Sequence, residues 1–420
     1  MDWKDRISAP PGLSSSQPGL APASHSSQTI LLESEASVSS GVSPFARLLE
    51  SRRAPSLRQP VRFLGWLIQS LFGIVSLILF LAVVAAIPIL NFLALGYLLE
   101  AEGRVARSGR LRDGFPLLDV APRFGSIALG FWLWLLPLRL LADAVYEARW
   151  IDPASRATQR LERLLPILTA MVTVHLCLAL ARGGSLGCFF RPLKNIRWLR
   201  ARLLERSYWS GAEQGIREFV AALRLRHHFS LGVRGFIGAF AWLAMPTLLF
   251  AAARKTAGLP ILVTLCGGLL LVLVLGWVPF LQARLAAENR LGAMFEFREV
   301  RRLRKSAPLC WLLAVVVTCT LSLPLYLANV VLPPADAMWL VTLIFIVSIY
   351  PARLLVGWAY SRALRRRDHP AGFGWRWLAS GVMLLLLGAY VFLLFFTQFI
   401  GEHGKLVLFQ HHALQLPMPF

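Results

Sequence analysis

The chain of 420 residues consists mostly of long apolar runs separated by short basic stretches. The first run, Phe63–Ala86, would form a helix of roughly 36 Å, whereas the hydrocarbon core of a bilayer measures roughly 30 Å. Later runs of comparable length predict further membrane-spanning helices. They cover residues 126–145, 161–181, 235–253, 259–282, 308–331, 337–358 and 377–400.

The stretch Ile87–Arg112 breaks this pattern. It contains a proline, then about three apolar helical turns, and then a basic segment. Pro88–Glu100 would span only roughly 20 Å, so residues 63–100 predict a proline-broken helical hairpin whose second arm is either a return span or a re-entrant half-helix. The backbone freed at such a break needs protein or water partners. Similar proline-containing runs lead into basic segments at Val278–Lys305 and Tyr350–Arg367.

The basic residues are distributed unevenly between the loops. Of the 44 Lys and Arg residues, 34 fall in residues 1–63, 101–125, 183–234, 283–307 and 359–376, and seven fall in the alternate segments. Positively charged loops remain in the cytoplasm. This predicts a cytoplasmic N-terminus and a C-terminus on the opposite side of the membrane.

The segments outside the predicted bundle at 63–400 have different compositions. Residues 1–46 hold twelve serines, five prolines and no apolar run, which predicts a disordered cytoplasmic tail. Residues 47–62 form a basic juxtamembrane segment, and 401–420 a non-cytoplasmic tail. The loop 183–234 predicts amphipathic cytoplasmic helices, which either lie in the membrane interface or cap the bundle. The candidate contacts to lipid headgroups are Lys194, Arg197, Arg200, Arg301 and Arg302.

Composition sets the fold class. Hydrophobic residues make up 56%, charged residues 16%, and the mean hydropathy is +0.60. These values predict an all-α polytopic transmembrane helix bundle. The net charge is +22, and the Lys and Arg residues that produce it lie between apolar runs instead of on a separate domain. This distribution indicates anionic membrane lipids as partners and not nucleic acid. A protein partner or a second copy of the chain is a further expectation.

No metal or cofactor is expected. The five cysteines show no CxxC spacing, and no nucleotide-binding or hydrolase motif is present. The pairs His227–His228 and His411–His412 lack a carboxylate at ligand spacing.

Polar groups at membrane depth are the candidates for function, because an unpaired charge there costs at least ~2.5 kcal/mol. The first hypothesis is a polar network between helices around the broken hairpin; the alternative is a set of ordinary helix-end charges that face water. The network would comprise Asn91, Glu100, Arg284, Glu288 and Arg353.

Three further residues are secondary candidates. His175 lies mid-span and would be a proton relay or, more simply, a neutral histidine bonded to a neighbouring helix. Arg139 and Asp143 are four residues apart, which places them on one helix face. A structural pair that lets Arg139 reach the interface is favoured over a substrate role.

The segments LNFLALGYLLEAEGRVARSGRLRDGFP, FLQARLAAENRLGAMFEFREVR and PARLLVGWAYSRALRRR resemble an uncharacterised family of multi-spanning bacterial membrane proteins. The first part of the chain is similar to a prokaryotic membrane domain of unknown function. The resemblance extends over most of the chain after about residue 60. It implies a bacterial inner-membrane setting and supplies no catalytic residue.

Three functional hypotheses follow. A transporter for a small or lipidic solute would use the broken helix as part of its binding site. A membrane-embedded accessory or scaffold protein would use the basic helices and the tail. A lipid-modifying enzyme, which is less favoured, would use Glu100, Glu288 and nearby arginines at headgroup level. A water-filled cavity that reaches Asn91 and His175 would favour transport. A cytoplasmic-face pocket lined by Glu100, Glu288 and Arg353 would favour an enzyme or lipid site, and a packed interior with neither would favour a structural role.

Overall fold

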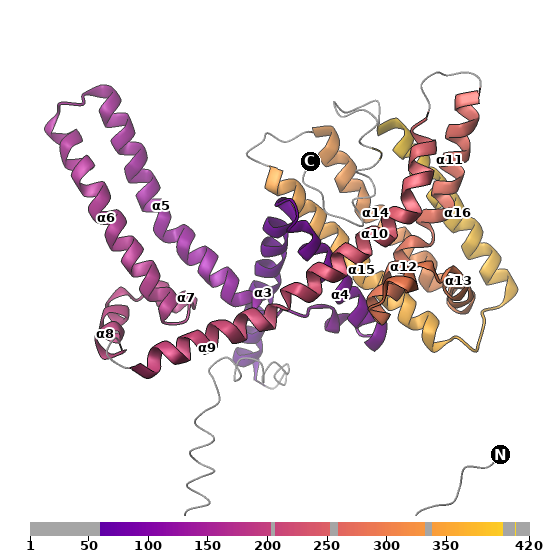
Figure 1. Ribbon diagram of the computed structural model, residues 1–420, viewed down its shortest axis with the longest axis horizontal. Helices are drawn as coiled ribbons and strands as arrows, with labels where there is room; N and C mark the ends of the chain where they lie inside the picture. Colours follow the sequence, from indigo (N-terminus) through magenta and orange to yellow (C-terminus); the bar gives the residue numbers. More distant parts are fainter. Residues whose placement is uncertain (1–58, 203–205, 253–258, 332–337, 398–407, 409–420) are drawn as a thin grey trace, which may run out of the picture. The chain divides into compact units, whose positions relative to one another are not determined.

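The computed structural model describes residues 59–202, 206–252, 259–331, 338–397 and 408. Helices account for nearly all of these residues, and no strand occurs among them (Figure 1). The tail predicted at 1–46, the basic residues up to 58, and the C-terminal tail apart from Leu408 lie outside the described residues.

Within the described ranges, eight helical stretches are long and apolar enough to cross a membrane. The predicted all-α bundle is therefore confirmed, and the chain is a multi-pass membrane protein. The helices that supply these stretches are α3 (Pro60–Ala86), α5 (Ala121–Ile151), α6 (Arg156–Ala181), α10 (Leu225–Phe250), α11 (Leu259–Leu275) with α12 (Val278–Glu288), α14 (Pro308–Val331), α15 (Met338–Arg365) and α16 (Phe373–Thr397).

Shorter elements join these spans. They are α4 (Asn91–Ser108), η1 (Leu111–Gly114), α7 (Leu186–Phe189), α8 (Pro192–Arg202), α9 (Arg206–Leu223), η2 (Leu291–Phe295) and α13 (Phe297–Ser306). The stretch predicted as one span at 259–282 is divided between α11 and α12. Trp277 precedes α12 and Pro279 lies in its first turn, where the missing N–H of proline costs no helical hydrogen bond.

The chain breaks at residues 87–90, where the proline predicts it. The residue before a proline avoids the helical region, and Ile87 accordingly ends α3 with extended backbone (φ −96°, ψ 121°). Ile89 has φ +72°, a left-handed conformation that is rare for a β-branched residue. The amide of Asn91 then bonds the carbonyl of Ile87 at 3.0 Å as α4 begins. Helix α4 packs against α3, so the two form a hairpin.

Helix α4 is the most enclosed of these elements, with 13 of its 18 residues buried. It packs against α3, α10, α12 and α15. Three of these contacts are made through glycine. A Cβ on Gly96 would lie 1.7 Å from the carbonyl oxygen of His228 on α10, and one on Gly103 would lie 2.5 Å from that of Ala286 on α12. From the other side, a Cβ on Gly357 of α15 would lie 2.5 Å from the carbonyl oxygen of Glu102. Small residues allow helix backbones to approach closely in membranes.

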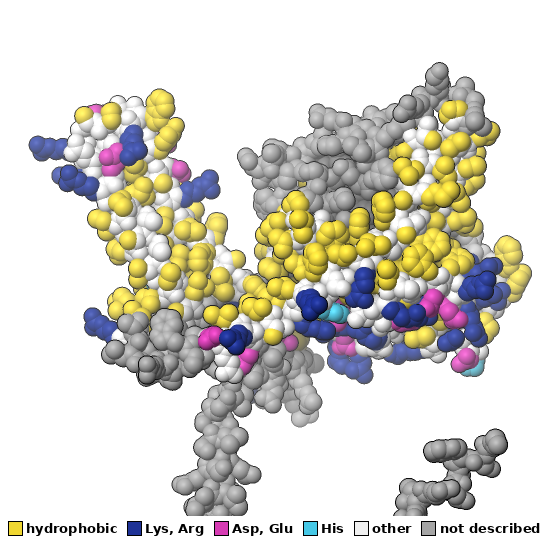
Figure 2. All heavy atoms as spheres, viewed as in Figure 1, with side chains coloured by type: hydrophobic (Ala, Val, Ile, Leu, Met, Phe, Trp, Pro, Cys, Tyr) yellow, Lys and Arg dark blue, Asp and Glu magenta, His cyan; other side chains and the backbone are white. Residues whose placement is uncertain are grey.

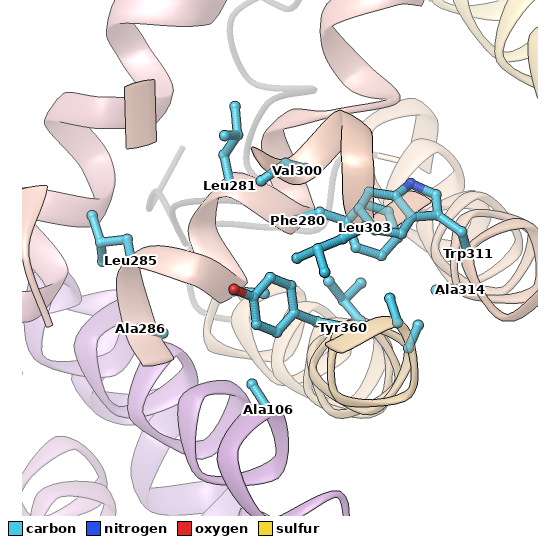
Figure 3. Close-up of a cluster of buried hydrophobic side chains, with 14 of the residues drawn as sticks. Ala106, Phe280, Leu281, Leu285, Ala286, Val300, Leu303, Trp311, Ala314 and Tyr360 are labelled. Atoms are coloured by element: carbon cyan, nitrogen blue, oxygen red, sulfur yellow. The ribbon is translucent and has the colours of Figure 1, made fainter. Parts of the chain in front are cut away.

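The largest apolar cluster lies beside α4. Phe280 of α12 and Trp311 of α14 stack with ring centroids 3.4 Å apart, and the indole nitrogen of Trp311 donates to the carbonyl of Gly276 at 3.5 Å. Figure 3 shows this pair with Leu303 of α13 and Tyr360 of α15 at its sides. Seven α-helices contribute buried residues to this core, which fixes the positions of the polar groups described below; they are α4, α10, α12, α13, α14, α15 and α16.

Helix α4 depends on its glycine contacts, so we expect Gly96→Ala to destabilise the protein. The new methyl group meets backbone instead of a movable side chain, and overpacking of this kind costs about 1–3 kcal/mol. Thermal unfolding of the detergent-solubilised protein measures the effect. Gly388→Ala on α16 is the control, because a Cβ there meets nothing within 4 Å and alanine favours helix by about 1 kcal/mol. Equal melting temperatures for the two variants would contradict the close approach of α4 and α10.

Candidate functional site

A buried ion pair joins α4 to α15. The guanidinium Nη1 of Arg353 lies 3.1 Å from the carboxylate Oε2 of Glu102 and donates to Oε1 of Gln282 on α12 at 2.5 Å. The side chains of Arg353 and Glu102 are 4% and 0% exposed. The amide nitrogen of Gln282 donates in turn to the carbonyl of Gly235 on α10 at 3.2 Å. This Glu102–Gln282–Arg353 cluster therefore connects four helices.

The two oxygens of Glu102 have different surroundings. Oε2 accepts from Arg353, whereas Oε1 is buried and has no hydrogen-bond partner among the described residues. Buried polar atoms are nearly always paired with protein or with water, and an unpaired one costs about 1–3 kcal/mol. Such an atom inside a membrane helix bundle marks a candidate functional position.

Arg353 also lines a pocket between α11, α12, α14, α15 and α16. The cavity has a volume of about 50 Å³, and its lining is mostly apolar. Pro279 borders it where the chain passes from α11 to α12, and Cys319, Ala352 and Tyr390 complete its walls. Its polar side chains are few, and two of them, Gln282 and Arg353, belong to the Glu102–Gln282–Arg353 cluster. The pocket therefore suits an apolar molecule with a hydrogen-bonding end.

Glu100 lies in a separate group between α4 and the start of α10. Its carboxylate is 3.0 Å from Arg104, 3.6 Å from Arg107, 4.0 Å from Arg224 and 3.2 Å from His227. Burial raises the pKa of Glu100, but hydrogen bonds from Arg104 and His227 and the nearby guanidinium charges outweigh it and lower the pKa below its ordinary value. The carboxylate is thus held ionised and bound on several sides.

Arg284 and Glu288 belong to a third group. Arg284 pairs with Glu288 at 3.0 Å and, through Nε, with Glu296 at 2.7 Å, while Arg290 pairs with both carboxylates. Burial raises the pKa of Glu296, but the hydrogen bonds from Arg284 and Arg290 outweigh it and lower the pKa. The group closes the turn between α12 and α13, with Tyr360 of α15 within 3.4 Å of Arg284.

The five residues of the proposed polar network do not form one network. Arg353, Glu100 and the Arg284–Glu288 pair belong to three different groups, each with its own partners. Asn91 is buried at the start of α4, and its side-chain oxygen has no hydrogen-bond partner among the described residues. The single network is therefore corrected to three groups, because Glu100 and Glu102 are two residues apart and point to different sides of α4, toward different neighbouring helices.

His175 has the simpler of its two expected roles. Its Nε2 lies 2.9 Å from the carbonyl of Phe189, which can only accept, so the ring donates. The same carbonyl accepts from Trp134 at 2.9 Å, and the rings of Trp134 and His175 have centroids 4.4 Å apart. His175 thus fixes α7 against the α5–α6 hairpin.

The remaining candidates lie on the surface. Arg139 and Asp143 are both exposed on α5, and no ion pair joins them in the part of the chain that the structure covers. The residues expected to contact lipid headgroups are all exposed, as the prediction requires. They are Lys194, Arg197 and Arg200 on α8, and Arg301 and Arg302 on α13.

Glu102 and Gln282 are the site residues that the sequence analysis did not select. Glu102 stands two residues after Glu100, in what reads as a water-facing helix end. Gln282 is the last residue of a predicted span and carries no charge. The sequence could still have indicated Glu102. Residues two apart on a helix face different sides, so Glu100 and Glu102 cannot both be exposed if other helices pack around α4.

No group of three or more histidine, cysteine, aspartate or glutamate side chains suited to a metal ion occurs in the described ranges. Of the adjacent pair His227–His228, His227 lies 3.2 Å from the carboxylate of Glu100.

Comparison with known proteins gives a single finding. Residues 202–334 match the model of a family described as a protein of unknown function (DUF4013). This confirms the resemblance to an uncharacterised family, but the matched range lies later in the chain than the first segment on which the resemblance rested. No curated protein and no solved structure shows a significant match. The match spans α9 to α14 and supplies Gln282 but not Glu102 or Arg353.

Removal of one partner of the buried pair has a predictable cost. We expect Arg353→Met to destabilise the protein by about 3–5 kcal/mol, because it leaves Glu102 buried without its cation. The double variant Glu102→Leu/Arg353→Met should recover most of this loss, since apolar side chains need no partner there. Unfolding of the solubilised protein by heat or denaturant provides the comparison.

The matched control for that pair is Arg217→Met, which breaks the exposed pair of Arg217 and Glu213 on α9. Exposed pairs contribute about 0–1 kcal/mol. If Arg353→Met cost no more than Arg217→Met, the pair would not be buried as described.

Proposed function

We propose that this chain is a transporter-like protein of the bacterial inner membrane that binds a lipid-like molecule in the pocket beside Arg353. The observation that carries the proposal is an apolar pocket inside the span helices with one member of a buried ion pair, Arg353, in its wall. Ligand sites are mostly apolar with a few fixed polar groups. In this proposal the apolar part is an acyl or isoprenoid chain that enters the pocket through its open mouth, with its polar end near Arg353 and Gln282.

The helix interruptions support the same proposal. In many transporters the binding site is built where membrane helices are discontinuous. Two interruptions among the described residues bear on the site: residues 87–90 separate α3 from α4, and Gly276 and Trp277 separate α11 from α12. The second borders the pocket directly, because Leu275 and Pro279 belong to its lining. The first begins the helix that carries Glu102.

The pocket meets neither of the two arrangements considered from the sequence. It contains Arg353, but Asn91, His175, Glu100 and Glu288 are not among its lining residues. Glu100 and Glu288 lie in separate ion-pair groups. The pocket therefore favours binding of an apolar molecule over chemistry by two paired carboxylates.

The threading proposed here places the basic edge in the cytoplasm. Figure 2 shows most Lys and Arg side chains of this face along the lower edge of a hydrophobic surface, over α4, α12 and α13, and a smaller group at the upper tip of the α5–α6 hairpin. This is the distribution that the positive-inside rule describes. On this threading the N-terminus is cytoplasmic and the C-terminus periplasmic.

The accessory role is the second candidate, and the α5–α6 hairpin favours it. Only 11% of the most apolar 18-residue stretch of α5 is buried inside the protein. Trp132 and Leu140 on α5 and Met171 on α6 are each at least 60% exposed. Lipid tails cover such a surface equally well, so the pocket remains the stronger basis.

Photo-crosslinking tests the pocket. The full-length protein in native-like membranes is incubated with a diazirine-bearing fatty acid, irradiated, and digested for mass spectrometry. We expect labelled peptides from residues 275–282, 315–319 and 349–356, which line the pocket. Ala352→Phe should lower the labelling about tenfold, equivalent to roughly 1.4 kcal/mol, because the ring fills the space.

Leu313→Phe is the control, because Leu313 is on α14 but 47% exposed. This variant should be labelled in the pocket to the same extent as the unaltered protein. Labelling confined to exposed surfaces such as α5, or equal labelling in both variants, would contradict a pocket-bound ligand.

A further inference from the structure

Helix α13 has two chemically opposite faces. Val300, Leu303 and Ser306 are buried against the bundle. Arg298, Arg301, Arg302 and Lys305 are exposed, and their spacing of three and four residues places them on one face. Arg304, between the faces, lies over the ring of Trp277 with its guanidinium carbon 4.3 Å from the ring centroid. The helix is therefore fixed to the bundle and presents a row of cations outward.

The end of α15 extends this row. The amide of Ala371 donates to the carbonyl of Lys305 at 3.0 Å, and the hydroxyl of Ser306 donates to the carbonyl of Arg367 at 3.4 Å. Arg367 also pairs with Glu299 at 3.4 Å. Arg366, which is exposed, directly precedes Arg367 in the chain and therefore lies near α13. We call Arg298, Arg301, Arg302, Lys305 and Arg366 the basic surface.

The basic surface lacks internal counter-charges. None of its five cations has an ion pair or side-chain hydrogen bond in the described residues, whereas Arg284, Arg290 and Arg367 nearby all pair with carboxylates. Crowding is visible at Arg304, whose pKa is lowered by burial and by the charge of Arg301. Cations gathered without counter-charges repel one another and attract an anionic partner.

The neighbouring aromatic residues indicate the depth of this surface. Phe373, Trp375 and Trp377, at the start of the spanning helix α16, are between 57% and 70% exposed. Tryptophan side chains at the ends of membrane helices lie at headgroup level. They follow Ala371 closely, so the basic surface sits at the same level, within reach of lipid phosphates.

We propose that the basic surface is a binding site for anionic phospholipid headgroups. Arginine pairs with phosphate through charge-assisted hydrogen bonds, and the basic surface offers four arginines and one lysine for such bonds. This site is separate from the pocket beside Arg353, so it stands or fails independently of the proposed function.

The test compares phosphatidylglycerol with phosphatidylcholine by native mass spectrometry of the full-length protein in detergent. The unaltered protein should bind phosphatidylglycerol preferentially. In the triple variant Arg301→Gln/Arg302→Gln/Arg366→Gln, the ratio of bound phosphatidylglycerol to bound phosphatidylcholine should fall about tenfold, since each cation near an anionic surface contributes to attraction. Arg301→Lys/Arg302→Lys/Arg366→Lys should retain most of it.

Arg156→Gln/Arg160→Gln/Arg163→Gln is the matched control, because it removes the same charge from exposed positions on α6. It should retain the preference. An equal loss in the control, or no loss in the first triple variant while both elute as folded monodisperse species, would overturn the proposal. Competition by water-soluble glycerol phosphate as strong as that by the lipid would also overturn it, because the ligand would then be a free phosphate.

Discussion

The close approach of three helices to α4 is the constraint on which the rest of this structure depends. Gly96, Gly103 and Gly357 let the backbones of α10, α12 and α15 lie against α4 at distances that leave no room for a side chain. Tight packing replaces the hydrophobic effect as the cohesive force inside a bilayer, because lipid tails are as apolar as leucine. Helix α4 can therefore carry carboxylates into the core only because its neighbours bring partners to meet them.

This packing explains how Glu102 and Glu100, two residues apart, have different roles. Glu102 faces α12 and α15 and meets Arg353, whereas Glu100 faces the start of α10 and meets His227. Each carboxylate is paired, which is the condition for burying a charge. Only Glu102 is connected to the pocket, through Arg353. A ligand that hydrogen-bonds to Arg353 would thus bind where α4, α10, α12 and α15 are connected.

Most of the helical architecture could be predicted from the sequence because apolar run length has a direct physical meaning in a bilayer. The break at Pro88 was equally accessible, since proline dictates the conformation of the residue before it. The interruption between α11 and α12 was missed, because Gly276 and Pro279 lie within a run that is apolar throughout. The presence of a spanning helix follows from the apolar character of the local sequence. A break in the middle of a span depends also on the residues that pack around it.

The site was only partly predictable for the same reason. The sequence identified Arg353 and Glu100 as charges near membrane depth, but it could not assign partners, because pairing depends on which helices are neighbours. Gln282 offered no charge to notice, although it bonds both Arg353 and the carbonyl of Gly235. His175 shows the converse: a lone histidine in a span is satisfied by a backbone carbonyl.

The central claim is that the pocket beside Arg353 holds a lipid-like molecule within the junction around α4. An experimental structure of the full-length protein in lipid nanodiscs tests it most directly. The account predicts elongated density between α12, α14 and α16 that ends near Arg353 and Gln282, with Arg353 still paired to Glu102. A pocket closed by its own side chains, or density for ordered water alone, would contradict it.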